Sequence, residues 1–286
     1  MSSPTGPRSR GGSSARADLA DILVQIVHRR TERLQEARRE DGWQATWSPP
    51  ALDAEPAPRT AASNRFLAGI EAQRGRAIIA EVKMGSPSLG SLADSVDPLA
   101  QARAYARGEA AALSVVVEPD FFHGSYELLA ACAEASGLPA VAKDFIVDPL
   151  QIEWARRAGA SAVLLIAALY APDELRDYAA IARACGLVPL IETHDADDVA
   201  KLDGADWELV GINNRDLRTF TVDLEQSMAL VPSLPVGALK VAESGIHEPD
   251  DLAGLRAAGF DAYLIGESLL TSGDPLAKLD ALRGAA

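Results

Sequence analysis

The stretch Ile78-Ile79-Ala80-Glu81-Val82-Lys83 is an apolar run that ends in charged side chains. Four later runs have the same form and end at Lys143, Glu192, Asn213 and Glu243. A strand covered by helices on both faces of its sheet reads as a continuous run of Val, Ile, Leu and Ala. Isolated buried charge costs too much free energy to be scattered without a use. The polar residues at the same end of several such runs therefore indicate a functional site.

Eight strand-like runs follow one another along the chain. They fall near residues 77–82, 112–117, 139–142, 161–167, 187–191, 208–212, 238–242 and 261–265. Between them, Asp97-Pro98, Asp148-Pro149 and Asp274-Pro275 each place a capping acid before a first-turn proline. Gly159, Gly186 and Gly259 follow helical stretches, where a left-handed residue is favoured. Eight strands alternating with helices are the count of a (β/α)8 barrel, which typically has about 250 residues.

A doubly wound open sheet is the competing architecture, and it normally carries a glycine-rich phosphate loop after its first strand. Here the first strand is followed by Lys83-Met84-Gly85-Ser86-Pro87-Ser88, which lacks the G-x-G-x-x-G pattern. The barrel also explains why five strands contribute polar ends, because these ends converge on one mouth. We therefore expect an α/β fold, a (β/α)8 TIM barrel with an N-terminal helical extension.

The chain before the first strand has three parts. Residues 1–17 are rich in Ser, Gly, Pro and Arg without any acid, which predicts a disordered tail, with an organelle transit peptide as the alternative. Leu19, Ile22, Leu23, Ile26 and Val27 form the stripe of an amphipathic helix within residues 18–38. The Pro-rich stretch from Asp41 to Thr60, with Trp43 and Trp47, predicts a surface loop. We expect residues 18–76 to form one domain with the barrel of residues 77–286.

Composition restricts the possible partners and the location. A net charge of −14 argues against nucleic acid or an anionic membrane as the partner. No apolar run approaches the roughly 20 residues needed to span a bilayer. Cys132 and Cys185 are too few for a disulfide framework and lack the spacing of metal ligands, which predicts two buried thiols, no metal site and a cytoplasmic location. An anionic substrate would need a locally positive pocket.

The polar strand ends can carry acid and base chemistry. Glu81 and Lys83 alternate along one strand, so both side chains point to the same face. With Lys143, Glu192 and Glu243 they bring three carboxylates and two ammonium groups to one mouth, where neighbouring charges shift one another's pKa values. A structural ring of ion pairs is the alternative. We favour the functional hypothesis, because replacing such pairs by apolar residues is often neutral for stability.

The last two strands indicate a phosphate site. Ser244-Gly245 follows the seventh strand and Gly266-Glu267-Ser268 follows the eighth, where many barrels bind phosphate through backbone N–H groups. Ser86 and Arg215 complete the expected shell.

As a set, these segments resemble the indole-3-glycerol-phosphate synthase family. The resemblance covers about residues 18–283 and rests on Ile79-Ala80-Glu81-Val82-Lys83-x-x-Ser86-Pro87-Ser88, Lys143-Asp144-Phe145-Ile146, Gly211-Ile212-Asn213-Asn214-Arg215-Asp216-Leu217, Ala242-Glu243-Ser244-Gly245-Ile246 and Leu264-Ile265-Gly266-Glu267-Ser268-Leu269. It implies a barrel with a helical extension that closes the indole ring of tryptophan biosynthesis. The substrate would be 1-(o-carboxyphenylamino)-1-deoxyribulose 5-phosphate, and CO2 and water would be released by this carboxy-lyase without a metal or organic cofactor. The oligomeric state stays open, with a monomer as the working expectation and other tryptophan-pathway enzymes as candidate partners.

The resemblance also implies roles for individual residues. Lys143 would be the general acid that protonates the substrate carbonyl. Lys83 would lie near the anthranilate carboxylate as the acid of dehydration, with Glu81 as its partner base. Glu192 and Asn213 would hold the anilino nitrogen and hydroxyl groups, and Glu243 would orient the lysines. Ser86, Ser244, Gly245, Gly266 and Glu267 would bind the phosphate, the last three by main-chain N–H groups, while Phe122 and Phe145 would wall the aromatic ring. Which lysine acts in which step is left open.

Two positions depart from the family pattern. Val115-Val116-Val117-Glu118 stands where a Leu-Thr-acid ending is common, and Met84 replaces a residue that is often basic. These departures leave room for a secondary-metabolism copy of the enzyme. His194 is expected to be a loop residue rather than a catalyst.

Two competing hypotheses remain. A phosphoribosylanthranilate isomerase would rely on an Asp/Cys pair, but neither Cys132 nor Cys185 ends a strand. A non-catalytic barrel that keeps the phosphate site is disfavoured because both lysines and all three glutamates are present.

Overall fold

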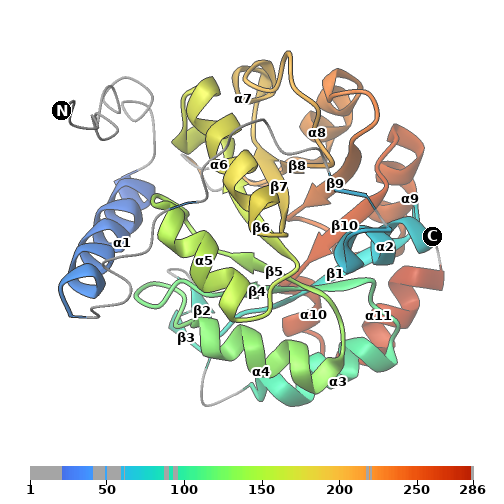
Figure 1. The fold of residues 1–286 in the computed structure, drawn as a ribbon. Helices are drawn as coiled ribbons and strands as arrows, with labels where there is room; N and C mark the ends of the chain where they lie inside the picture. Colours follow the sequence, from blue (N-terminus) through green and yellow to red (C-terminus); the bar gives the residue numbers. More distant parts are fainter. Residues whose placement is uncertain are drawn as a thin grey trace, which may run out of the picture.

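The computed structural model describes residues 21–40, 49, 59–60, 62–86, 90–92, 96–216, 219 and 221–284. Eight parallel strands close into a barrel in the order β1-β10-β9-β8-β7-β6-β5-β4 (Figure 1). They are β1 (Ala77–Val82), β4 (Ala112–Val116), β5 (Ala140–Lys143), β6 (Ala162–Ile166), β7 (Val188–Thr193), β8 (Leu209–Asn213), β9 (Leu239–Glu243) and β10 (Ala262–Ile265). The expected barrel is confirmed, and its strands have bounds close to those expected from the sequence.

Helices surround the barrel (Figure 1). They are α3 (Pro98–Arg107), α4 (Tyr126–Ser136), α5 (Pro149–Arg157), α6 (Pro172–Ala184), α7 (Ala196–Ala200), α8 (Leu224–Leu230), α9 (Pro249–Ala258), α10 (Glu267–Leu270) and α11 (Pro275–Gly284), with short 3-10 turns at Ala167–Leu169 and Val231–Ser233. Two short strands that follow β1 along the chain, β2 (Gly85–Ser86) and β3 (Gly90–Ser91), pair with each other in a separate sheet.

The expected helix boundaries are confirmed at both ends. The side chains of Asp97 and Asp148 accept backbone N–H bonds at the starts of α3 and α5, and Asp274 does the same for α11. Gly159 and Gly259 have φ angles of 82° and 109°, which only glycine adopts without strain. These local signals fix where each helix turns back towards the sheet.

Strand register brings the polar strand ends to one rim. Lys143 of β5 pairs with Val116 of β4, and Asn213 of β8 pairs with Glu243 of β9. Because all eight strands are parallel, their carboxyl ends face the same way. The apolar remainder of each strand is buried, so charge inside this barrel is concentrated at its mouth.

Helix α2 (Arg65–Ala72) packs at the opposite end of the barrel. Asn64 caps the helix, and its Nδ2 donates to the carbonyl of Ser161, 2.9 Å away. A Cβ on Gly69 would lie 2.5 Å from the carbonyl oxygen of Ala111, so the two backbones approach closely. Ser161 and Ala111 directly precede β6 and β4. Helix α2 therefore covers the amino ends of the strands.

Helix α1 (Asp21–Glu40) packs at the mouth instead. Its apolar stripe is buried at Leu23, Ile26 and Val27, while Ile22 is half-buried. The expected amphipathic helix is thus confirmed over the described residues. The predicted tail of residues 1–17, Leu19, and most of the Pro-rich loop with Trp43 and Trp47 lie outside the described residues.

The two cysteines are free thiols. Cys132 on α4 is buried as expected, but Cys185 is only half-buried because it caps the end of α6, directly before the turn at Gly186. Neither ends a strand. Within the described part of the chain, no helix combines the length and apolarity needed to cross a membrane.

Candidate active site

A cavity of about 530 Å³ opens at the carboxyl ends of the strands. Every expected site residue except Glu243 lines it: Glu81, Lys83, Ser86, Phe122, Lys143, Phe145, Glu192, Asn213, Arg215, Ser244, Gly245, Gly266 and Glu267. Side chains far apart in the sequence therefore meet in one cavity, as the strand ends predict.

One carboxylate bridges the two lysines. Lys83 Nζ lies 3.3 Å from Glu81 Oε1, and Lys143 Nζ lies 3.1 Å from Glu81 Oε2. Burial would raise the pKa of Glu81, but the ammonium groups of Lys143 and Lys83 lower it to about 2. Burial would likewise lower the pKa of Lys143, yet the carboxylate of Glu81 raises it above its usual value. At neutral pH, Glu81 is thus a carboxylate and Lys143 an ammonium, a group that can donate a proton.

Glu243 lies beneath the floor of the cavity and is fully buried. Its Oε2 is 3.7 Å from Lys143 Nζ, and a Cβ on Gly211 would stand 2.2 Å from its Oε1. Glycine on β8 therefore makes room for this carboxyl group. Neither oxygen accepts a hydrogen bond from the described residues. Burial, together with the charge of Glu192, raises the pKa of Glu243 to about 8, which favours the neutral carboxyl group.

Glu192 has the opposite charge state, and His194 explains why. His194 Nε2 lies 3.1 Å from Glu192 Oε1, and Nδ1 lies 3.4 Å from Asp198 Oδ2. Burial would lower the pKa of His194, but these two carboxylates raise it to about 10. Although burial opposes it, the imidazolium lowers the pKa of Glu192. Two neighbouring glutamates are thus driven to different protonation states, as in sites where one carboxyl is an acid and the other a base.

The position of His194 only partly matches the sequence prediction. It does follow β7 as a loop residue, but its side chain is buried between two carboxylates. His194 precedes α7 and its N-cap Asp195, and the turn into this helix brings the imidazole beside Asp198.

The loop after β9 has an unusual backbone. Ser244 and Gly245 have φ angles of 66° and 75°, both in the left-handed region. Asn214 Nδ2 holds this turn by donating to the carbonyls of Glu243 and Ser244, at 2.8 and 2.9 Å. A non-glycine residue at positive φ costs free energy and is typical of functional turns. The strain at Ser244 therefore supports a role for this loop.

The loop after β10 lies against the carboxylate of Glu81. A Cβ on Gly266 would lie 2.4 Å from Glu81 Oε1, so only glycine fits here without displacing a neighbour. Beside it, Arg215 Nη2 lies 3.1 Å from Glu267 Oε2. Ser86, which is nearly buried, lines the same cavity from β2. The last two strands of the barrel, β9 and β10, thus border the site together with the guanidinium of Arg215.

An aromatic wall closes another side. The rings of Phe122 and Phe145 lie 5.9 Å apart between centroids. The fully buried Glu118 organises the loop that carries Phe122, because its carboxylate accepts the backbone N–H groups of Asp120, Phe121 and Phe122 at 2.9, 2.7 and 3.0 Å. Glu118 was not among the site residues expected from the sequence, although it follows an apolar run as the other site residues do.

Helix α1 also lines the cavity, through Ile22, Leu23 and Ile26. This contribution was not expected from the sequence, which predicted an apolar stripe without indicating what it covers. His247 is a further lining residue that the sequence did not single out. Among the described residues, no group of three or more His, Cys, Asp or Glu side chains is arranged to hold a metal ion.

Comparisons with known proteins place the chain in a family. The family model "Indole-3-glycerol phosphate synthase" matches residues 23–282. The chain is 40% identical to the indole-3-glycerol phosphate synthase of Desulfotalea psychrophila over 91% of this chain and 99% of that protein. It is 44% identical to the one of Salinibacter ruber over 74% of this chain and 78% of that protein.

Solved structures show the fold alone. Tryptophan synthase subunit alpha from Legionella pneumophila has a TM-score of 0.55 at 14% identity, and the match covers 78% of this chain and 98% of that one. Orotidine 5'-phosphate decarboxylase from Pyrococcus horikoshii has a TM-score of 0.57 at 12% identity, and the match covers 73% of this chain and 98% of that one. The extent of the sequence match, rather than these structures, shows that the chain belongs to the indole-3-glycerol phosphate synthase family.

Proposed function

We propose that the residues around this cavity carry out the family's reaction, the decarboxylating and dehydrating ring closure of 1-(o-carboxyphenylamino)-1-deoxyribulose 5-phosphate to indole-3-glycerol phosphate. The observation that supports this most is the bridge from Glu81 to both Lys83 and Lys143 in the mouth of a barrel. Closing a C–C bond onto an aromatic carbon disrupts aromaticity, so the reaction needs a strong electrophile. An ammonium group held beside the carbonyl supplies it by protonation.

Lys143 donates its proton to the carbonyl oxygen of the substrate, and the aromatic carbon that bears the carboxylate then attacks the carbonyl carbon. Loss of CO2 returns the electron pair of the broken C–C bond to the ring. The new hydroxyl leaves as water after it takes a proton from Lys83, and a proton lost from the ring system passes to the base. Glu81 serves as the partner base, while Glu192 and Asn213 hold the anilino nitrogen and the hydroxyl groups. Glu243 orients Lys143 from beneath the floor.

The phosphate is bound at the other side of the cavity. Its proposed donors are the backbone N–H groups of Gly245, Gly266 and Glu267 and the hydroxyls of Ser86 and Ser244, with the guanidinium of Arg215 nearby. Backbone N–H groups at such loops suit an anion because they present fixed partial positive charge. A locally positive rim lets an acidic protein accept a dianionic substrate.

The anthranilate ring lies in the apolar part of the cavity. Phe122 and Phe145 offer one wall, and the aliphatic residues of α1 offer another. Desolvation by these walls strengthens each electrostatic contact inside the site.

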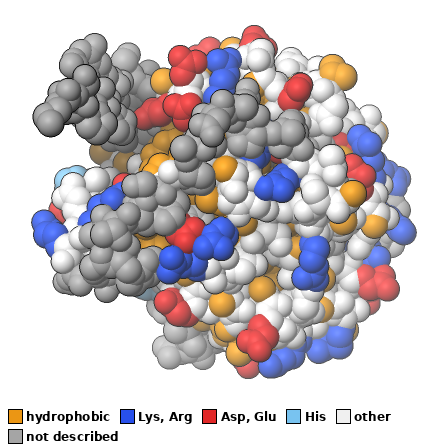
Figure 2. Space-filling model, in the orientation of Figure 1, with side chains coloured by type: hydrophobic (Ala, Val, Ile, Leu, Met, Phe, Trp, Pro, Cys, Tyr) orange, Lys and Arg blue, Asp and Glu red, His pale blue; other side chains and the backbone are white. Residues whose placement is uncertain are grey.

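We also propose a cytoplasmic enzyme that acts on a small phosphorylated molecule, without a nucleic-acid or membrane partner. The net charge of −14 supports this, as does the mixture of acidic and basic side chains on the face drawn in Figure 2, where neither sign forms a continuous surface. A monomeric state, a partnership with other tryptophan-pathway enzymes, and the organisation of residues 18–286 as one domain stay predictions.

A steady-state assay of the purified full chain tests the proposal. With 1-(o-carboxyphenylamino)-1-deoxyribulose 5-phosphate as substrate, the protein should release indole-3-glycerol phosphate and CO2 in equal amounts without added metal, and in the presence of a chelator. Absence of product from a folded protein would favour the non-catalytic phosphate-binding barrel.

A further inference from the structure

The last residue of β5 and the one after it point in different directions. Lys143 points inward and pairs with Glu81 at 3.1 Å. The carboxylate of Asp144 meets α1, where it accepts hydrogen bonds from Arg30 Nε at 3.0 Å and from Arg30 Nη2 at 2.5 Å. This difference follows from the alternation of side chains along a strand. One peptide bond therefore connects the proposed proton donor to Asp144, which borders the cavity and whose carboxylate pairs with Arg30 of α1.

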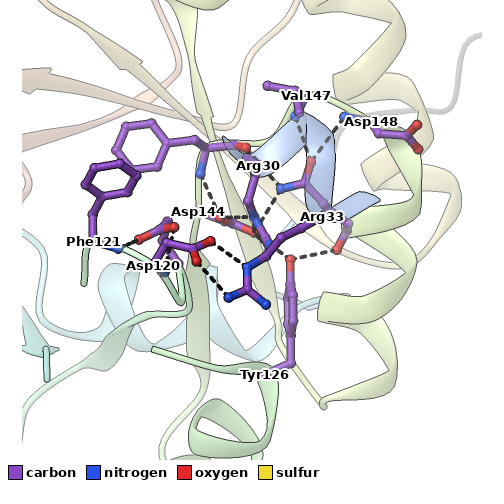
Figure 3. A network of polar contacts seen from close by, with 11 residues as sticks. Arg30, Arg33, Asp120, Phe121, Tyr126, Asp144, Val147 and Asp148 are labelled. Carbon is purple, nitrogen blue, oxygen red and sulfur yellow. Dashed lines mark hydrogen bonds and ion pairs between the residues drawn. The ribbon is translucent and has the colours of Figure 1, made fainter. Parts of the chain in front are cut away.

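The ion pair of Arg30 and Asp144 is buried and takes part in further hydrogen bonds. Arg30 is 3% exposed and Asp144 2% exposed, although the residues are 114 positions apart. Figure 3 shows Arg30 and Tyr126 converging on Asp144, and the Tyr126 hydroxyl donates to Asp144 Oδ2 at 2.8 Å. Burial would lower the pKa of Arg30, but the charge of Asp144 raises it above its usual value. Arg30 is thus held as a guanidinium cation beside Asp144.

The same network holds the backbone around Lys143. Asp144 Oδ1 accepts the backbone N–H of Phe145 at 2.9 Å. Gln151 Nε2 donates both to Asp144 Oδ2 and to the carbonyl of Phe145, at 2.9 and 3.0 Å. The segment that carries the proton donor and one aromatic wall is therefore fixed from outside the barrel.

Arg30 itself has little freedom to move. Its guanidinium carbon lies 6.0 Å from the centre of the Tyr126 ring and 5.9 Å from that of Trp154. Burying an ion pair removes two charges from water, so the net gain in stability is often small. What the pair does provide is a fixed geometry, because a guanidinium that donates two hydrogen bonds to one carboxylate sets both distance and angle.

We propose that Arg30 is a positioning residue for Lys143, acting through Asp144, so that the docking of α1 sets the rate of the chemical step as well as the shape of the cavity. The inference rests on the proposed role of Lys143 as the general acid. It separates two contributions of α1. Ile22, Leu23 and Ile26 form part of the wall and should affect KM, whereas Arg30 lies outside the cavity and should affect kcat.

The matched control lies on the same helix. Arg38 donates to Asp148 at 2.7 Å, but this pair is half-exposed. Asp148 caps α5 and does not follow β5 directly, as Asp144 does. Arg30→Met and Arg38→Met each remove one guanidinium of α1 while keeping an unbranched side chain. Arg30→Lys keeps the positive charge but cannot form the bidentate pair with the carboxylate of Asp144.

The experiment measures kcat, KM, folded fraction and melting temperature of each full-length variant. Arg30→Met should lower the kcat of the folded protein by about tenfold to a hundredfold, since a displacement of about 1 Å can cost about 10²-fold in rate. Arg30→Lys should recover part of that loss, and Arg38→Met should stay within about twofold of the wild type. A lower melting temperature with unchanged kcat in Arg30→Met would show a purely structural role and overturn the proposal, as would a change confined to KM.

A double variant keeps the test decisive if Arg30→Met folds poorly. Arg30→Met with Asp144→Asn leaves no uncompensated buried charge and keeps an amide oxygen for the Phe145 N–H, so it should fold better than either single variant but still turn over slowly. Wild-type kcat in the double variant would refute the positioning role. Lys143→Ala in the same assay tests the proposed function separately. Full activity of Lys143→Ala would show that Lys143 is not the general acid. An inactive Lys143→Ala together with a fully active Arg30→Met would contradict only the inference about Arg30.

Discussion

The backbone of Gly266 packs against the carboxylate of Glu81, so that a Cβ at position 266 would stand 2.4 Å from Glu81 Oε1. Glu81 cannot easily move away, because both of its oxygens are paired with lysines. The loop after β10, which we propose to bind the phosphate, is therefore in direct contact with the proposed acid–base cluster of Glu81, Lys83 and Lys143.

Gly266→Val should accordingly impair both binding and chemistry. We expect KM to rise because the loop is displaced from the phosphate, and kcat to fall by about tenfold or more because Glu81 and its lysines shift. Gly273→Ala is the matched control, because a Cβ there meets no atom of the described residues within 4 Å. Thermal protection by inorganic phosphate should be weaker in Gly266→Val than in the wild type. Undiminished protection would place the anion elsewhere.

Lys143→Ala should lose turnover while keeping phosphate binding. A general acid acts mainly in the transition state, so kcat should fall by about 10²- to 10⁴-fold. The shift in melting temperature with phosphate concentration should match that of the wild type. Lys278→Ala, which changes a lysine of α11 paired with Glu248, is the control and should keep wild-type kinetics. Wild-type kcat in Lys143→Ala across the pH range would exclude the assignment.

His194→Asn should change how stability depends on pH. The folded pKa of His194 is about 10 against an ordinary value of 6.5, so the folded protein holds this proton more tightly than the unfolded chain. Its contribution is fully present below pH 6.5 and is lost as the pH rises through about 10. The difference in unfolding free energy between wild type and variant should shrink over that window, as measured by denaturant titration at several pH values. His28→Asn, at a side chain that is 75% exposed, is the control variant for the same substitution.

Glu243→Gln tests the neutral state of the carboxyl group beneath the floor. Because the folded pKa is about 8 against an ordinary 4.5, the wild type should lose stability as the pH rises between these values. The amide cannot ionise, so the variant should lack this decline and match the wild type most closely near pH 5. An identical pH dependence in both proteins would mean that Glu243 is ionised in the folded state.

Truncation should separate the tail from α1. Deleting residues 1–17 is expected to leave melting temperature and kcat/KM unchanged, because this composition offers neither core nor motif. Deleting residues 1–40 removes three cavity-lining aliphatic residues and the buried Arg30, so it should lower stability and expose apolar surface. A fall in both quantities on deletion of residues 1–17 alone would show that the tail packs on the barrel.

The fold was largely predictable from local patterns. Continuous apolar runs marked the strands, and Asp97 or Gly259 marked helix ends, because caps and left-handed turns depend on residues that are adjacent in the chain. The mouth was predictable for the same reason: once parallel strands close into a barrel, Glu81, Lys143 and Glu192 must meet.

The rest depended on contacts between distant segments. Nothing near Arg30 in the sequence indicates that its partner is Asp144, and nothing near Glu243 indicates that Gly211 leaves space for its carboxyl group beneath the cavity. Alternation along a strand gives the direction of a side chain but not its depth or charge state. These follow from strand register and from the set of charges that tertiary packing brings together.

The placement of α1 also bears on how the protein is made. Arg30 leaves the ribosome 114 residues ahead of Asp144, and at about 5–20 residues per second this interval lasts on the order of ten seconds. Throughout it, the apolar stripe of α1 has no barrel to cover. We therefore expect α1, although it is made before the barrel, to be among the last elements to settle, so that the cavity is completed only when this helix docks onto strands made later.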